Sequence, residues 1–286
     1  MRRLPCSVVV LQSHCWTRSE SALTGMEIWR FALIALFGLG VGTLSGMFGV
    51  GGGTMIVPLL NLVLGVPMLN ATSTSLFSIA PTSISGSYRH LRQGTVEVTP
   101  ALMFGIPGAV ASLLSASISG FLPEWVTTAG AVGVIAFSAF RMFREAAKKP
   151  IDDSGRTAEM RFSSKTAANL VTAAIGAFAG FIAGIVGVGG GFIIVPFGMA
   201  LLGYTMKEMS AISLLSIAII AIPGIATHAY LGHIWYLYGI ALVVGTIPGA
   251  AIGVWLIKKF EEKTLRLAFG CLLVLSGTLL LVNRLN

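Results

Sequence analysis

Two glycine-rich pentapeptides are the segments of this chain best suited to bind a ligand. The sequence GVGGG occupies Gly49–Gly53 and returns at Gly187–Gly191. A glycine run costs roughly 1 kcal/mol per residue inside a helix, so it should break the helix and leave backbone amides free. New helices would start at Thr54 and Phe192, and helix N-termini with exposed amides bind anions. Close packing of a tight turn without a ligand is the alternative. The predicted anion-binding residues are Gly49, Gly51, Gly52, Gly53, Thr54, Gly187, Gly189, Gly190 and Gly191.

The segment that follows the first pentapeptide is rich in hydroxyl groups. It reads NATSTSLFSIAPTSISGS over 70–87, with serines and threonines at helical spacing on one face. Hydroxyls on one face of a membrane helix can line a polar path, or they can bond to helix carbonyls. Both interpretations stay open. The candidate substrate-contacting residues are Ser75, Ser78 and their repeat equivalents Ser213 and Ser216.

Charged and titratable side chains sit at the ends of apolar segments. Arg89 either anchors its segment at the cytoplasmic membrane surface or draws anions into a vestibule. His90 and His228 are repeat equivalents, and they either lie at the membrane interface or form a pH-sensitive pair in such a vestibule. No Asp or Glu lies inside an apolar segment. That pattern argues against a carboxylate-driven pump and against a cation channel with an acidic ring.

The residue patterns that support enzymatic chemistry do not occur in the sequence. No Ser-His-Asp set stands out, and the three cysteines have no metal-ligand spacing. GVGGG lacks both the GxGxxG spacing and the Lys-Ser/Thr of a phosphate-binding loop. We therefore expect no enzyme activity, no catalytic residues, no metal and no cofactor.

The composition predicts the kind of element that carries these residues. Of the 286 residues, 55% are hydrophobic and 10% are charged, and no Asp, Glu, Lys or Arg occurs over Phe31–Tyr88, Thr166–Met206 or Met209–Ile257. About 20 apolar residues cross a bilayer as a helix, so we predict an all-α polytopic membrane protein. The basic residues behind the net charge of +8 lie in loops between apolar segments, as in cytoplasmic loops of membrane proteins. They do not indicate nucleic-acid binding.

An internal repeat with an offset of 138 residues (187 − 49) organises the chain. GVGGGTMIVP and GVGGGFIIVP agree at eight of ten positions, and each half holds about five apolar segments. Basic loops switch position between the halves, because YRHLRQG pairs with HAYLGH, and FLPEW pairs with KKFEEKTLR. This switch predicts two inverted-topology repeats with glycine-broken helices, each making an odd number of crossings, either three or five.

The repeat divides the chain into four parts. Residues 1–25 form an N-terminal extension outside the core, 26–143 the first transmembrane repeat, 144–165 a cytoplasmic connector, and 166–286 the second transmembrane repeat. Whether translation starts at Met1 or at Met26 stays open. Glycines at every fourth position predict helices that pack closely between the two halves. These glycines are Gly38, Gly42 and Gly46, and Gly176, Gly180 and Gly184.

Longer segments resemble a known family. GTLSGMFGVGGGTMIVP (Gly42–Pro58) and GFIAGIVGVGGGFIIVP (Gly180–Pro196) resemble the duplicated motif of the TauE/SafE sulfite exporter family. TSTSLFSIAPTSISGSYRHLRQG (Thr72–Gly94) is similar to the family's first-half pattern. The similarity covers about residues 27–285. The resemblance implies a permease for small anions, often sulfur-containing, such as sulfite or organosulfonates.

These features together predict a secondary permease or exporter of a small anion, multi-pass in the cell inner (cytoplasmic) membrane. Its partners would be the anionic substrate and the lipid bilayer, and a homodimer is left open. An anion channel without alternating access and a non-transporting membrane assembly subunit are the alternatives.

Overall fold

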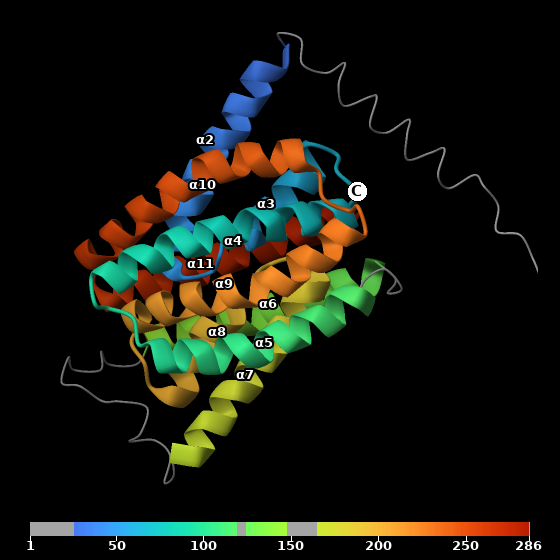
Figure 1. Ribbon diagram of the computed structural model, residues 1–286. Helices are drawn as coiled ribbons and strands as arrows, with labels where there is room; N and C mark the ends of the chain where they lie inside the picture. The colour runs from blue at the N-terminus through green and yellow to red at the C-terminus, as the bar shows by residue number, and fades with distance from the viewer. Residues whose placement is uncertain (1–25, 119–123, 148–164, 286) are drawn as a thin grey trace, which may run out of the picture.

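The computed structural model describes residues 26–118, 124–147 and 165–285. In these ranges the chain forms helices joined by short turns, and they contain no strand (Figure 1). The all-α class predicted from the composition is therefore confirmed. The predicted N-terminal extension and most of the predicted connector lie outside the described residues.

The same order of elements occurs twice along the chain. The first half contains α2 (Met26–Phe48), α3 (Gly53–Pro58), the π-helical turn η1 (Leu59–Val63), α4 (Met68–Arg92), α5 (Val98–Ile118) and α6 (Glu124–Ala146). The second half contains α7 (Lys165–Val186), α8 (Gly191–Phe197), the π-helical turn η4 (Gly198–Leu202), α9 (Met206–Tyr230), α10 (Tyr236–Leu256), the short 3-10 helix η5 (Ile257–Lys259) and α11 (Glu262–Leu285). Each glycine pentapeptide thus lies between a long helix and a short one.

Most of the long helices are suited to a membrane. Five of them, α2, α5, α7, α9 and α10, contain apolar stretches of 21 to 25 residues, which is enough to cross a bilayer. Helix α4 also has 25 residues, but its hydroxyl groups make it less apolar, and most of these hydroxyls are buried inside the protein. A polar helix face is tolerated at membrane depth where it packs against protein. The chain is a multi-pass membrane protein.

The glycines at every fourth position pack the two halves against each other. A side chain at Gly42 of α2 would collide with the backbone of Thr246 in α10, and one at Gly180 of α7 would collide with the backbone of Gly108 in α5. Each contact joins a helix of one half to a helix of the other. The predicted close packing between the halves is confirmed, and the halves form one interleaved body from which α2 and α7 project on opposite sides (Figure 1).

Helices α4 and α9 lie together at the centre and run in opposite directions. Gly86, near the end of α4, faces Leu214 near the start of α9, and Gly224, near the end of α9, faces Leu76 near the start of α4. Helix α10 instead runs parallel to α4, since the Trp235 amide donates to Thr74 and the Thr82 hydroxyl bonds to that of Thr246. The hydroxyl-rich face of α4 is thereby enclosed by helices of the other half.

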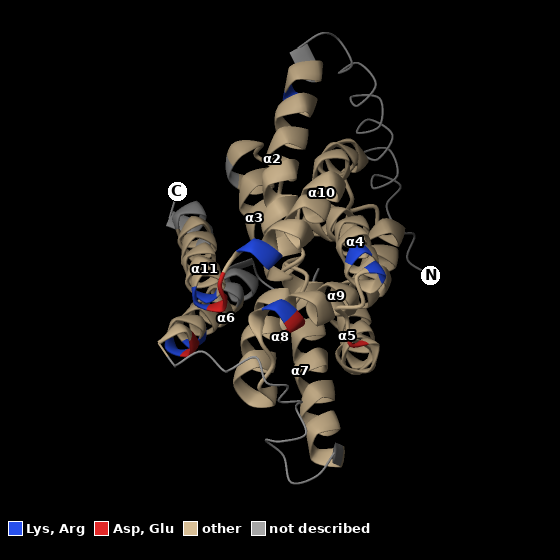
Figure 2. Cartoon of the chain, turned by 90° about the vertical axis from the view of Figure 1, so that its left-hand side faces the viewer, with Lys and Arg blue, Asp and Glu red and all other residues tan. Residues whose placement is uncertain are grey.

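Charged residues of several helices gather at one end of this bundle (Figure 2). Helices α4 and α10 end there, and α5, α9 and α11 begin there. The Tyr204 hydroxyl, just before α9, lies 3.4 Å from a carboxylate oxygen of Glu97 beside the start of α5. The buried Arg266 of α11 bonds to the Glu145 carbonyl at the end of α6. We call this face the charged end; its lysines and arginines include Arg89, Arg92, Lys207, Lys258 and Lys259.

Candidate functional site

The two glycine turns meet at the centre of the protein. A side chain on Gly53 would strike the Gly187 carbonyl and the Val188 backbone, and one on Gly191 would strike the backbones of Gly49 and Val50. All ten pentapeptide residues are buried. Three glycines in each turn have φ between 71° and 84°, a left-handed conformation that strongly favours glycine. The two equivalent turns therefore pack against each other and form one compact junction.

Hydroxyl groups from one half hold the turn of the other half. The Ser213 hydroxyl of α9 donates to the Gly49 carbonyl at 2.7 Å. Its repeat equivalent, Ser75 of α4, donates to the Gly187 carbonyl at 3.1 Å. The last carbonyl groups of a helix have no partner within that helix. The two serines thus satisfy carbonyls left free where α2 and α7 end.

The neighbouring hydroxyls also bond to carbonyl oxygens. The Thr72 hydroxyl donates to the carbonyl of Val186, the last residue of α7. The Ser78 hydroxyl donates to the Ser75 carbonyl at 2.9 Å, and that of Ser216 lies 3.0 Å from the Ala101 carbonyl. A hydroxyl proton bonded to a carbonyl cannot be donated to an anion at the same time. In this conformation the candidate serines position the backbone.

Backbone amides are the free donors at the junction. The amides of Gly49 and Gly187 continue their helices, because they donate to Ser45 and Ala183 at 2.8 Å. Among the described residues, no acceptor bonds to the amides of the next glycines, Gly51, Gly52 and Gly53, or of Gly189, Gly190 and Gly191. More than nine in ten buried amides in proteins have a partner. Six free amides at one buried junction could together stabilise a negative charge. Thr54 lies beside them as a buried residue in the first turn of α3.

The predicted vestibule residues divide into one exposed and two buried side chains. Arg89 is exposed at the charged end. His90 is buried there, and its Nδ1 lies 2.9 Å from the Thr95 hydroxyl. His228 is fully buried near the end of α9, with its ring 5.8 Å from that of His233. Because α4 and α9 are antiparallel, the two equivalent histidines lie toward opposite ends of the bundle and do not contact each other.

Sequence reasoning missed further buried polar groups beside these histidines. Ser83 and Ser87 precede His90 on the same face of α4, and each of the three side chains has a buried polar atom without a partner in the described structure. Toward the opposite end of the bundle, the Ser112 hydroxyl of α5 and both ring nitrogens of His228 also have no hydrogen-bond partner among the described residues. The spacing i, i+4, i+7 of Ser83, Ser87 and His90 was a helical signal that could have identified the first group.

His233, in the turn after α9, extends the second group toward the surface. Its Nδ1 is buried and finds no partner among the described side chains and backbone. Burial lowers the pKa of His233 below its ordinary value, so its ring is neutral at neutral pH. Unpartnered polar atoms therefore extend from the glycine junction toward both ends of the bundle.

Comparisons with known proteins agree with this architecture. The model of the family described as sulfite exporter TauE/SafE matches residues 34–280. The chain is 28% identical to the probable membrane transporter protein YunE of Bacillus subtilis, covering 86% of this chain and 96% of YunE. It is 31% identical to a probable membrane transporter protein of Xylella fastidiosa, covering 85% of this chain and 92% of the relative. No solved structure gives a significant match.

The family match takes in both glycine turns, the central helices α4 and α9, and all or most of each long helix that packs around them. The relatives agree over nearly their full lengths, so the likeness concerns the whole bundle and not one shared motif. The chain is a membrane transporter of the TauE/SafE sulfite exporter family.

Proposed function

We propose that this protein is a secondary permease for small oxyanions of sulfur, such as sulfite or an organosulfonate, in the cytoplasmic membrane. The observation that carries the proposal is the group of six buried glycine amides without an acceptor at the junction of the two turns. Fixed amides in a water-poor site stabilise an anion without introducing a positive charge. Helices α3, α4 and α8 contain no Asp or Glu to repel it.

The substrate path passes from the charged end through the junction to the opposite end. Ser83, Ser87 and His90 provide its polar groups on one side, and Ser112 and His228 provide them on the other. Arg89 at the entrance attracts anions. By the positive-inside rule, the charged end faces the cytoplasm.

Transport proceeds by movement of the two halves against each other. Inverted topology is supported by the antiparallel packing of the repeat equivalents α4 and α9. From Gly53 to Val63 the chain advances only about 16 Å at 1.5 Å per residue, against a hydrocarbon core of about 30 Å. This length favours a re-entrant segment and three crossings per half. The turns are in tight contact in this structure, so a change in the packing of the two halves is needed to open the junction to an anion.

Uptake into proteoliposomes tests the proposal. Wild-type protein should take up sulfite or sulfoacetate with saturation and show counterflow of labelled substrate, with little uptake of sodium. Gly189→Ala adds a methyl group at the turn, whereas Gly65→Ala adds one at a similar positive φ in open space. We expect at least a tenfold loss of flux in Gly189→Ala and near wild-type flux in Gly65→Ala. Equal flux in the two folded variants would show that the glycine junction is not the anion-binding site.

A further inference from the structure

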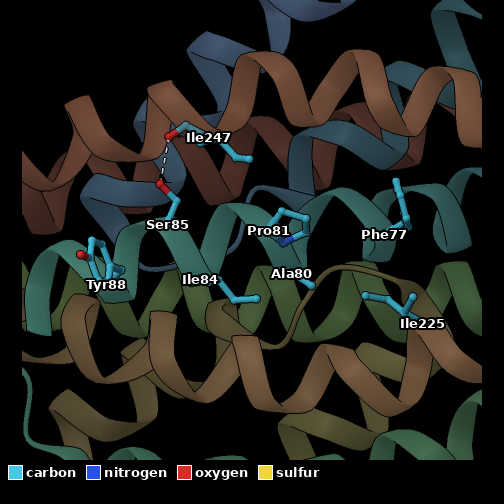
Figure 3. Close-up of a pocket in the computed structure, with 8 residues that line it drawn as sticks. All are labelled: Phe77, Ala80, Pro81, Ile84, Ser85, Tyr88, Ile225 and Ile247. Carbon is cyan, nitrogen blue, oxygen red and sulfur yellow. Dashed lines mark hydrogen bonds between the residues drawn. The ribbon is translucent and has the colours of Figure 1, made fainter.

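A groove of about 510 Å³ opens on the side of the bundle between α4, α9 and α10 (Figure 3). One face of α4, from Phe77 to Tyr88, forms most of its lining, and Ile225 of α9 and Ile247 of α10 complete it. The lining is almost wholly apolar, because the Ser85 hydroxyl is occupied by a bond to the Ile247 carbonyl at 3.2 Å. A lining of this kind is suited to the hydrocarbon chain of a lipid.

The groove has the length of one lipid leaflet. Phe77 and Tyr88 are 11 residues apart (88 − 77), which corresponds to about 16 Å along an α-helix. Half of a typical hydrocarbon core is about 15 Å. An acyl chain that enters beside Tyr88 would therefore reach Phe77 near the middle of the bilayer.

Two arginines stand at the mouth of this groove. Arg89 directly follows Tyr88 in the chain, and Arg92 lies one helical turn after Tyr88 with its guanidinium over the Tyr88 ring, 4.8 Å from the ring centre. Both side chains are exposed, and no carboxylate of the described residues pairs with either guanidinium. Lys258, in η5 directly after α10, adds positive charge near His90 at the same end of the bundle. The mouth of the groove is thus positively charged, and no described carboxylate neutralises that charge.

We propose that this groove binds an anionic phospholipid of the leaflet at the charged end. One acyl chain lies along α4 between Ile84 and Ile247, and the phosphate contacts Arg89 and Arg92. Basic pockets between membrane helices on the cytoplasmic side bind anionic headgroups, with about 1 kcal/mol from each Lys or Arg near the surface. A zwitterionic lipid would fill the groove but leave the arginines without net counter-charge.

The internal repeat allows the groove face of α4 to be compared with the equivalent face of α9. On α9, the equivalent of Ile84 is the exposed Ile222, while Thr227 and Tyr230 stand where α4 has its two arginines. That face has similar apolar exposure without the basic mouth. Selectivity for an anionic lipid should therefore be confined to the α4 side.

Native mass spectrometry of the full chain, offered equal amounts of phosphatidylglycerol and phosphatidylcholine with the same acyl chains, tests this site. Wild-type protein should retain the anionic lipid at least tenfold more. The double variant Arg89→Gln/Arg92→Gln should lose roughly thirtyfold in relative affinity for the anionic lipid, the factor expected for two basic residues. Lys207→Gln removes a charge from the same end away from the groove and should leave the preference unchanged.

A second pair of variants tests the acyl-chain part. Ile84→Trp narrows the groove and should reduce retention of both lipids, while Ile222→Trp should not. Equal retention of the two lipids by wild-type protein, an unchanged preference in the arginine variant, or the same loss from Ile222→Trp as from Ile84→Trp would each overturn the proposal. Because lipid retention is measured and not flux, the outcome is independent of the proposed transport function.

Discussion

The hydrogen bonds that join each half to the glycine turn of the other make a quantitative prediction. In Ser213→Ala, the Gly49 carbonyl loses its 2.7 Å bond and stays buried. An unsatisfied buried acceptor costs about 1–3 kcal/mol, whereas single hydrogen bonds within membrane bundles average about 0.6 and reach about 1.7 kcal/mol. We therefore expect Ser213→Ala to lower the free energy of unfolding by about 1–2 kcal/mol. Ser75→Ala, which removes the longer 3.1 Å bond, should cost somewhat less.

Equilibrium unfolding with SDS in mixed micelles measures this loss. Ser117→Ala is the matched control, because its exposed hydroxyl bonds only to Leu113 of its own helix; exposed substitutions of this kind usually change stability by less than about 0.5 kcal/mol. The double variant Ser75→Ala/Ser213→Ala should depart from additivity, since the two turns contact each other. If Ser213→Ala unfolds with the same free energy as Ser117→Ala, the cross-half bonds do not hold the junction together.

Three further predictions concern packing and the polar path. Gly42→Ala should strongly destabilise the protein, because its methyl group meets the Thr246 backbone. Gly40→Ala adds a methyl group to the same helix in open space and should be neutral or slightly stabilising. The yield of folded protein after detergent extraction, and the thermal unfolding midpoint of what is recovered, compare the two variants. Arg266→Met breaks the contacts with Glu262 and the Glu145 carbonyl and should lower the free energy of unfolding by about 3–5 kcal/mol. A loss below about 1 kcal/mol would show that Arg266 does not hold α11 against α6. His228→Phe removes two buried ring nitrogens that have no hydrogen-bond partner among the described residues, so the stability of the protein should be unchanged or higher. Sulfite flux should fall at least tenfold. Unchanged flux would show that His228 does not line the proposed substrate path.

Much of the architecture follows from local patterns in the chain. The charge-free stretches predict long apolar helices, since charged groups are costly in hydrocarbon whatever the fold. The glycine pentapeptides predict an interruption where α2 ends at Phe48 and α7 ends at Val186, because glycine is unfavourable in a helix and favourable in a left-handed turn. Glycines at every fourth position predict close helix packing. Each inference depends only on residues within a few turns of one another.

The tertiary structure decided which of these surfaces meet. Helical periodicity shows that Ser75 and Ser213 lie on one face of their helices, but the pairing of each with the turn of the opposite half spans 112 and 164 residues. The same holds for the helices that pack against the glycines at every fourth position, and for the burial of His228 between helices. Periodicity defines a face through the geometry of one helix, whereas its partner depends on how all the helices share the interior. The apolar groove that ends at Tyr88 is likewise formed by three helices that no local pattern brings together.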